Sequence, residues 1–397
     1  MRPLPQLLNH NKPREFNMSS ITYNFPPFIC FGWGEAEKVA DHAKAVDANH
    51  PLIVTDEGLE KNGILYQITS RLETRKISYA VYKGVHPNPS EEDVEAGLRV
   101  YRGEACDSII ALGGGSPMDA AKAILTLTNH PGKLEEYYVG APGRKMLTNR
   151  MPPFIAIPTT SGTGSETSRG AIITDATNRK RAVSSPYLLP RTVILDPSLT
   201  AGMPPRLTAY TGLDAFSHNL EAFAVDAYAP ICDAFAREGM KLVAKSLIRA
   251  YRDGANREAR SDMMMASTMG SLAFMKGLGV VHSLAHQLSS QRGIPHGAAC
   301  GIMMPGAIRF NLVEEKTRPK YAEVAEILGG EANPDEAPTL LEELLSHLGV
   351  ERRLSKWGVT EADIAIMSRN AMLDHCHPKN PRTCSEETMA DLYRATL

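Results

Sequence analysis

Residues 107–127 read DSIIALGGGSPMDAAKAILTL, and this stretch is the strongest indication of how the chain folds. It begins with an apolar run, continues with three consecutive glycines, and then repeats apolar residues at helical spacing. This order predicts a strand, a tight turn and a helix, the unit from which helix-covered parallel sheets are built. Glycines let the backbone approach an anion, and the N–H groups at a helix start stabilise negative charge. We therefore expect a phosphate-binding turn within an α/β fold.

The glycine turn differs from the common dinucleotide-binding motif. Ser116 is placed to cap the helix and Pro117 to occupy its first position. After Gly115 the next glycine is Gly132, so the G-x-G-x-x-G spacing is missing. The ribose-binding acid is best matched by Asp56, which ends an earlier strand and would favour NAD over NADP by repelling a 2′-phosphate. The alternatives are a simple tight connection and a solvated turn acid.

Short apolar runs alternate with helical patterns through the first half of the chain. The runs cover residues 51–59, 77–85, 152–166, 169–175 and 192–199, and a helical pattern covers 91–105. Such alternation predicts a mostly parallel, doubly wound sheet. One run ends in PTTSGTGSE, whose hydroxyls and glycines are suited to lining a ribose, a phosphate or the nicotinamide.

The second half has a different pattern. From about Pro204 the apolar residues recur at helical spacing and strand-like runs are scarce. This change predicts an all-helical domain. We expect a flexible N-terminal extension at residues 1–20, an α/β domain at 21–203 and a helical domain at 204–397.

Composition excludes several classes of function. The 397 residues carry a net charge of −2 and are 43% hydrophobic, without the basic run that nucleic-acid binding usually shows. No apolar run reaches the roughly 20 residues that would span a bilayer, and the first residues lack the apolar core of a signal peptide. The six cysteines are far apart and form no C-x-x-C pair, which is typical of a reduced cytoplasmic protein.

The segment GLDAFSHNLEAF, residues 212–223, places an acid and a histidine on one helix face. Asp214 and His218 are four residues apart, so they point the same way, and the flanking apolar residues indicate that this face is buried. Burying both side chains without a partner is costly. A divalent metal or a structural hydrogen bond would satisfy them.

Three histidines follow in VVHSLAHQLSSQRGIPHGAA, residues 280–299. Spacing alone favours His282 and His286 as a chelating pair, because H-x-x-x-H places both on one helix face. His296 would have to return by a turn. One acid with two or three histidines suits Fe(II) or Zn(II), with one position left for substrate. The alternatives are helix-face histidines bonded to backbone, or a catalytic histidine that is not a ligand.

Seven segments together carry a family resemblance. They are GGGSPMDAAK, PTTSGTGSE, DPSLTAGMP, TGLDAFSHNLEAF, GLGVVHSLAHQL, GIPHGAACGIMMP and NPRTCSEETMADLYRA. In this order, over about residues 24–397, they resemble the iron-dependent (group III) alcohol dehydrogenase family. The resemblance implies a Rossmann-like nucleotide-binding domain followed by an all-helical metal-binding domain, the dehydroquinate synthase-like fold. It also implies an active site between the domains and a homodimer or larger assembly.

The resemblance also implies a role for individual residues. The metal ligands would be Asp214, His218, His282 and His296. His286 would face the nicotinamide and the substrate as the catalytic histidine that relays a proton. The cofactor contacts would be Asp56, Asn88, Gly113, Gly114, Gly115, Ser116, Asp119, Thr159, Thr160, Thr163 and Lys180.

The implied reaction is reversible hydride transfer between a primary alcohol and NAD, with Fe(II), or alternatively Zn(II), polarising the substrate oxygen. Alternatives on the same fold are a zinc-dependent glycerol dehydrogenase-like enzyme, a dehydroquinate-synthase-like lyase, and a reductase for carboxylated, sulfonated or phosphonated aldehydes. An alternative from another class is a non-catalytic nucleotide or metal sensor.

One segment departs from the family pattern. AFMKGLG, residues 273–279, is one residue shorter than the family's AFSNAGLG-type stretch, which lines the substrate side. Phe274 and Lys276 are therefore candidate substrate residues. Lys276 either points to solvent or binds an acidic group of the substrate.

Overall fold

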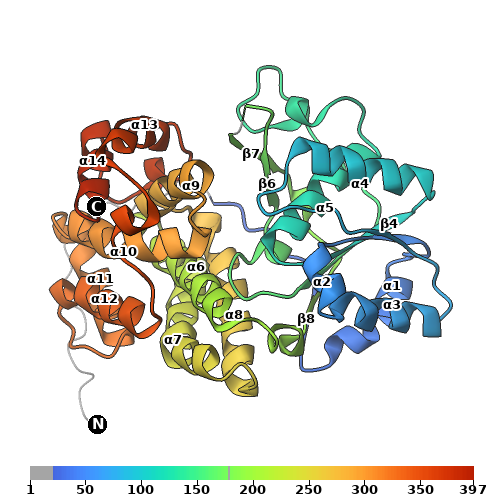
Figure 1. The fold of residues 1–397 in the computed structure, drawn as a ribbon, viewed down its shortest axis with the longest axis horizontal. Coiled ribbons are helices and arrows are strands. Elements are labelled where there is room, and N and C mark those ends of the chain that lie inside the picture. The colour runs from blue at the N-terminus through green and yellow to red at the C-terminus, as the bar shows by residue number, and fades with distance from the viewer. Residues whose placement is uncertain (1–20, 178) are drawn as a thin grey trace, which may run out of the picture.

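The computed structural model describes residues 21–177 and 179–397. The chain folds into two parts that lie side by side. One part contains a sheet with helices on both faces, and the other is made of helices (Figure 1). The predicted α/β plus all-α architecture is thereby confirmed. The predicted extension, residues 1–20, lies outside the described residues.

The sheet has six strands in the order β1-β8-β5-β4-β2-β3, and every pair is parallel. The strands are β1 (Phe28–Phe31), β2 (Pro51–Val54), β3 (Ala80–Tyr82), β4 (Ser108–Gly113), β5 (Phe154–Pro158) and β8 (Thr192–Leu195). From β2 the chain adds β3 on one side, and it then crosses to β4 on the other. The order therefore reverses between β2 and β4, and ligands of such sheets bind outside the carboxyl ends of the strands at this point.

Helices cover both faces of this sheet because its strands are apolar on both sides. Neighbouring strand residues such as Ile109 and Ile110 belong to different hydrophobic clusters, one on each face. The covering helices are α1 (Val39–Ala45), α2 (Glu57–Lys61), α3 (Ile64–Thr74), α4 (Glu91–Gly103) and α5 (Gly115–Thr128). A separate antiparallel pair, β6 (Gly170–Thr174) and β7 (Lys180–Ser184), extends toward the helical part.

The helical part is built around one buried helix. The helices are α6 (Pro205–Ala224), α7 (Pro230–Arg252), α8 (Arg257–Ala273), α9 (Val280–Arg292), α10 (His296–Asn311), α11 (Arg318–Ile327), α12 (Ala337–His347), α13 (Glu361–Ala371) and α14 (Glu386–Arg394). Helix α6 packs against α7, α8 and α10, and almost every residue from Gly212 onward is buried. Polar side chains on this stretch of α6 must therefore find partners inside the protein.

In the described part of the chain, no single helix is long and apolar enough to cross a bilayer. Helices α8 and α9 reach the necessary length and composition only when taken together, and they are bent by 113° at the break between them. Their apolar side chains belong to the helical core. All six cysteines are free thiols.

Candidate active site

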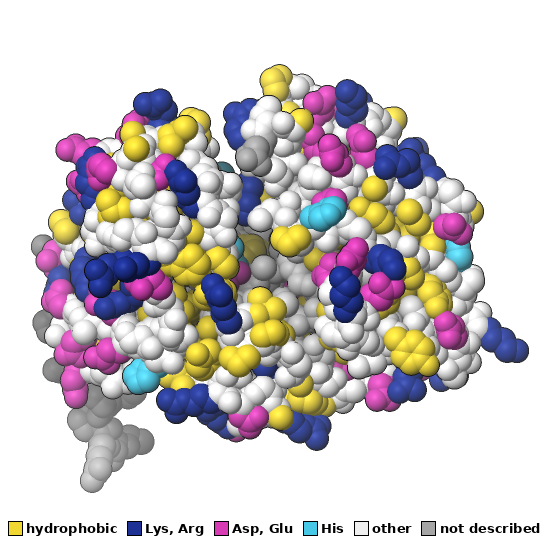
Figure 2. Space-filling model, viewed as in Figure 1, with side chains coloured by type: hydrophobic (Ala, Val, Ile, Leu, Met, Phe, Trp, Pro, Cys, Tyr) yellow, Lys and Arg dark blue, Asp and Glu magenta, His cyan; other side chains and the backbone are white. Residues whose placement is uncertain are grey.

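Three helices bring an acid and three histidines to the groove between the two parts of the chain. Asp214 and His218 lie on α6, His282 lies on α9, and His296 is the first residue of α10. Helix α9 ends at Gly293, whose φ of 65° reverses the chain and returns His296 to the same place. Figure 2 shows the surface hollowed between the two parts.

The imidazoles converge on one carboxylate oxygen. Oδ1 of Asp214 lies 3.5 Å from Nε2 of His296, 3.9 Å from Nε2 of His218 and 4.0 Å from Nε2 of His282. These distances are too long for hydrogen bonds. They suit donors that share an ion, because metal–ligand bonds of about 2.0–2.2 Å place tetrahedral donors roughly 3.3–3.6 Å apart.

The two ring nitrogens of His282 have different environments. Nδ1 donates to Oε2 of Glu221 at 2.6 Å, whereas the buried Nε2 has no hydrogen-bond partner among the described residues. A histidine held by a carboxylate through one nitrogen and free at the other is the usual arrangement of a metal ligand. Burial opposes protonation of His282, but the bond to Glu221 and the charges of the neighbouring carboxylates together outweigh it and raise the histidine pKa.

Sequence reasoning missed Glu221. It follows Asp214 and His218 at positions i+7 and i+3 of the same helix, so the buried face of α6 carries all three. This spacing was the available indication. Glu221 also accepts from the backbone N–H groups of Val281 at 2.7 Å and His282 at 3.3 Å, which fixes the start of α9 against α6.

The other two histidines at this cluster are electrically neutral near pH 7. Burial lowers the pKa of His218 to about 4. Burial, followed by the positive charge of Lys180, lowers the pKa of His296 well below its ordinary value. Neutral imidazole is the form that binds a metal ion, so these shifts prepare the site for one.

His286 has a different partner from the cluster at Asp214. Its Nδ1 donates to Oδ2 of Asp374 at 2.8 Å, and its ring stacks on that of His296 with centroids 5.3 Å apart. Asp374 also accepts from the Ser283 hydroxyl and the Cys376 backbone N–H, both at 2.9 Å. Burial lowers the pKa of His286, and Asp374 opposes that shift. Asp374 lies 88 residues further along the chain, and no local pattern indicated it.

The two candidate substrate residues separate in the structure. Phe274 lies in the short helix η6 (Phe274–Lys276) with its ring 5.1 Å from the ring of His218, beside the metal cluster. The Lys276 side chain is fully buried, and its Nζ pairs with Oδ1 of Asp233 at 2.5 Å. The interpretation that Lys276 points to solvent is therefore wrong, because Asp233 holds it inside. The same ion pair neutralises the charge that would bind an acidic substrate.

The glycine turn follows β4 at the reversal of strand order, as the strand–turn–helix pattern predicted. Helix α5 begins at Gly115, and Gly114 is its cap residue, without a side-chain hydrogen bond. The prediction that Ser116 caps this helix and Pro117 begins it is wrong, because the helix begins two residues earlier, at Gly115. The Ser116 hydroxyl instead accepts from the backbone N–H of Asn88 at 3.3 Å. The turn's own N–H groups are thus left for an anion.

The glycines also allow a second loop to pack on the turn. A Cβ atom on Gly114 would lie 3.1 Å from Oγ1 of Thr160, and one on Gly115 would lie 2.8 Å from Cγ2 of Thr163. The Thr159 backbone N–H donates to the carbonyl of Gly113 at 3.0 Å. The loops after β4 and β5 therefore form one continuous surface at the strand ends.

Two of the remaining predicted cofactor residues, Asp56 and Asp119, already accept hydrogen bonds within the protein. Asp56 follows β2 and caps α2 through the Leu59 N–H at 3.1 Å. Asp119 is buried, and its two oxygens accept from the Ser165 hydroxyl at 2.7 Å and the Ile172 N–H at 3.1 Å. Its carboxylate therefore holds β6 and the second loop in place.

Lys180 lies between the two parts of the chain. Burial lowers its pKa, and nearby acidic groups that include Asp119 and Asp214 oppose this shift. Because these acids belong to different parts, the ammonium group lies between the glycine turn and the metal cluster. The structure thus brings the four predicted metal residues together, whereas Asp119 is bonded inside the protein and Lys276 is paired with Asp233.

Comparisons with known proteins agree with this geometry. Residues 26–197 match the family model described as iron-containing alcohol dehydrogenase, and residues 208–397 match that of the C-terminal part of the Fe-containing alcohol dehydrogenase family. The chain is 36% identical to alcohol dehydrogenase 4 of Saccharomyces cerevisiae, over 95% of this chain and 99% of the relative. It is 33% identical to the NAD-dependent methanol dehydrogenase of Bacillus methanolicus, over 94% and 98%.

A solved structure shows the same architecture. The crystal structure of a 1,3-propanediol oxidoreductase superposes with a TM-score of 0.91 at 34% identity, covering 96% of this chain and all of that one. The family models cover both halves of the chain, and these relatives match it almost from end to end. The chain therefore belongs to the iron-containing alcohol dehydrogenase family and is an alcohol oxidoreductase.

Proposed function

We propose that the chain catalyses reversible hydride transfer between a small primary alcohol and NAD in the groove between its two parts. The observation that carries this proposal is the convergence of three imidazole Nε2 atoms on Oδ1 of Asp214, opposite the glycine turn. Iron is the family's metal, held here by Asp214, His218, His282 and His296. When bound, it polarises the substrate oxygen and lowers the pKa of the alcohol hydroxyl.

His286 is the residue that moves the proton released from the alcohol. Its Nδ1 is held by Asp374, so Nε2 is the nitrogen available for proton exchange. Because burial lowers its pKa, the ring is neutral near pH 7 and ready to accept a proton. Asp374 then stabilises the imidazolium that forms, since a carboxylate beside the ring favours its charged form.

The loops at the carboxyl ends of β2, β4 and β5 would hold NAD. The N–H groups of Gly114, Gly115 and Ser116 would bind its phosphates, and the second loop, through Thr159, Thr160 and Thr163, would line the nicotinamide side. The backbone near Asn88 and the ammonium group of Lys180 complete this surface. Asp56 accepts from a ribose hydroxyl and disfavours NADP. Asp119 acts on the cofactor through the loop that it positions.

A homo-oligomer is the proposed assembly. Strand β1 is an edge of the sheet, and the side chains of Phe28 and Phe31 on it are 64% and 46% exposed. An exposed apolar edge strand invites pairing with another chain. We place this assembly in the cytoplasm, where the six free thiols stay reduced.

The test is turnover by protein loaded anaerobically with Fe(II), Zn(II) or no metal, using a panel of short alcohols, diols and aldehydes with NAD or NADP. We expect metal-dependent formation of NADH from a primary alcohol. Binding of NAD and metal without turnover of any substrate would overturn the proposal and support the alternative of a sensor. Preference for a sulfonated or carboxylated aldehyde would support the alternative that the enzyme is a reductase for acidic aldehydes.

A further inference from the structure

We infer that Cys300 is an additional ligand of the metal centre and that it biases this centre toward zinc. The inference rests on the metal site of the proposed function and goes beyond its four ligands. Cys300 lies on α10, one helical turn after His296, and is completely buried. Two residues four apart on a helix face the same way, so both side chains point at Asp214.

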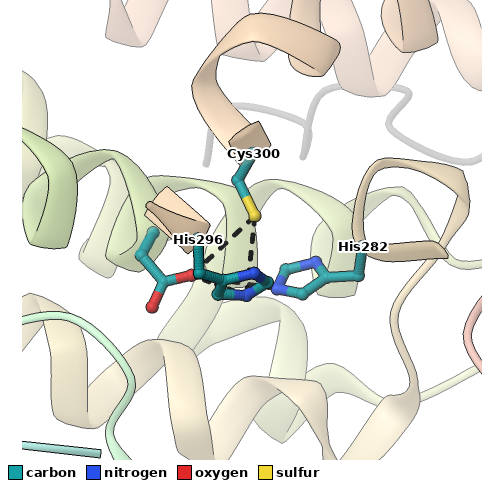
Figure 3. A group of neighbouring side chains, drawn as sticks. His282, His296 and Cys300 are labelled. Atoms are coloured by element: carbon teal, nitrogen blue, oxygen red, sulfur yellow. Dashed lines mark hydrogen bonds and ion pairs between the residues drawn. The ribbon is translucent and has the colours of Figure 1, made fainter. Parts of the chain in front are cut away.

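The distances place the thiol among the metal donors. Sγ of Cys300 lies 3.7 Å from Nε2 of His296 and 3.9 Å from Oδ1 of Asp214. Figure 3 shows the side chains of His282, His296 and Cys300 converging on one point. The donor atoms of Asp214, His282, His296 and Cys300 all lie within 4.8 Å of one another.

A second observation points to a metal rather than to simple packing. Nε2 of His282 is buried and has no hydrogen-bond partner among the described residues, and it faces the same carboxylate as the thiol. The nitrogen is unpaired because Nδ1 of the ring is already bonded to Glu221. An ion between His282 and Cys300 would satisfy the nitrogen and would replace the long thiol contacts to Asp214 and His296 by a metal–sulfur bond.

The site therefore holds two overlapping sets of ligands. One combines Asp214 and three histidines, and the other replaces His218 by Cys300. His218 approaches Asp214 to 3.9 Å but does not belong to the four-donor group that closes within 4.8 Å. The ring of His218 instead stacks on that of His282 at 4.6 Å.

The chemistry of the second set favours zinc. Zinc readily takes one carboxylate oxygen, two imidazoles and one thiolate in tetrahedral geometry, with a Zn–S bond of about 2.3 Å. A thiolate is a soft ligand and selects zinc over the harder Fe(II). The metal–sulfur bond replaces the S–H bond, and the thiol proton leaves to solvent. The thiolate and the Asp214 carboxylate then balance the two charges of the ion.

The direct test is the absorption spectrum of the full chain loaded with Co(II) alone, without NAD or alcohol. We expect an intense sulfur-to-cobalt charge-transfer band in the wild type and its loss in Cys300→Ser. Cys106→Ser is the matched control, because Cys106 is buried and belongs to none of the candidate metal-binding groups among the described residues, whereas Cys376 forms such a group with His286 and Asp374. Absence of the band in the wild type, or its survival in Cys300→Ser, would overturn the inference. Absence of the band from the wild type refutes the inference even where the variant fails to fold, and loss of a wild-type band in Cys376→Ser would assign the sulfur to the second candidate group and overturn the inference.

A competition between Zn(II) and Fe(II), read by metal analysis of the recovered protein, gives the second readout. We expect Cys300→Ser to lower the bound zinc-to-iron ratio roughly tenfold, the lower end of the effect of losing a group at a metal site. An unchanged ratio would contradict the bias toward zinc. Turnover without a sulfur band would refute this inference alone, and a sulfur band without turnover on any alcohol would refute the proposed function alone.

Discussion

Glu221→Gln tests the metal assignment, because Glu221 is the group that fixes His282. One carboxylate oxygen accepts from the Val281 N–H at 2.7 Å, and the other accepts from the His282 ring at 2.6 Å and its backbone N–H at 3.3 Å. A glutamine has one acceptor oxygen and an NH₂ group in place of the other. Whichever way the amide turns, a buried N–H group then faces another donor.

Two losses follow from this geometry. An orphaned buried donor costs about 1–3 kcal/mol, so the free energy of unfolding of the metal-free protein should fall by that amount. Where the NH₂ faces the ring, His282 loses the bond that orients Nε2. Mutation of such outer partners lowers metal affinity about 10–100-fold, or about 1.4–2.7 kcal/mol.

The assay is competition for Zn(II) or Co(II) against a chelator, followed by chemical denaturation of the metal-free protein. Asp374→Asn is the matched control, because it makes the same carboxylate-to-amide change beneath His286. We expect this control to bind metal as the wild type does and to lose rate. Unchanged affinity in Glu221→Gln, or an equal loss of metal in both variants, would refute the assignment of His282 as a ligand and His286 as a non-ligand.

Three further changes test other parts of the site. His286→Ala should still contain metal on metal analysis. Its kcat should fall about 10²–10⁴-fold, the usual contribution of acid–base catalysis. A metal-free variant would contradict the role of His286 as a residue that does not bind the metal. Asp56→Asn should lower the ratio of kcat/KM with NAD to kcat/KM with NADP. It should leave α2 folded, because asparagine caps a helix as well as aspartate does. An unchanged ratio of the two kcat/KM values would exclude contact between Asp56 and the ribose. Burial raises the pKa of Glu166 to about 7, so the wild type loses stability as pH rises from about 4.5 through about 7. At pH 8, Glu166→Gln should therefore exceed the wild type in free energy of unfolding by up to about 3 kcal/mol, measured by chemical denaturation. At pH 4 the two proteins should not differ in this way.

The fold could be predicted because its pattern is local. The run from Ser108 to Thr128 contains a strand, a turn and a helix whose apolar spacing and glycines act within one segment. The same holds for α6, where Asp214 and His218 share a buried face. The predicted Ser116 cap failed because the packing of Thr160 and Thr163 against the glycines, across two loops, sets where α5 begins.

Distant partners explain what the sequence did not show. Lys276 was assigned to solvent or to substrate, yet Asp233 on α7, 43 residues away, binds it inside the protein. Asp374 lies in the loop after α13 and meets His286 only in the folded chain. Neither contact leaves a periodic pattern in the sequence, because each depends on how whole helices pack.

The partners of His282 and His286 favour different roles for two rings that spacing alone treats as a chelating pair. The two rings stand one turn apart on α9, so H-x-x-x-H spacing treats them as equivalent chelators. In the folded chain each donates Nδ1 to a different carboxylate, His282 to Glu221 and His286 to Asp374. Glu221 comes from the helix that carries the metal acid, so it turns Nε2 of His282 toward Asp214. Asp374 comes from the loop after α13 and holds His286 for its proposed role in proton transfer. The carboxylate behind each ring, and not the spacing between the rings, is therefore the feature on which the proposed roles of His282 and His286 rest.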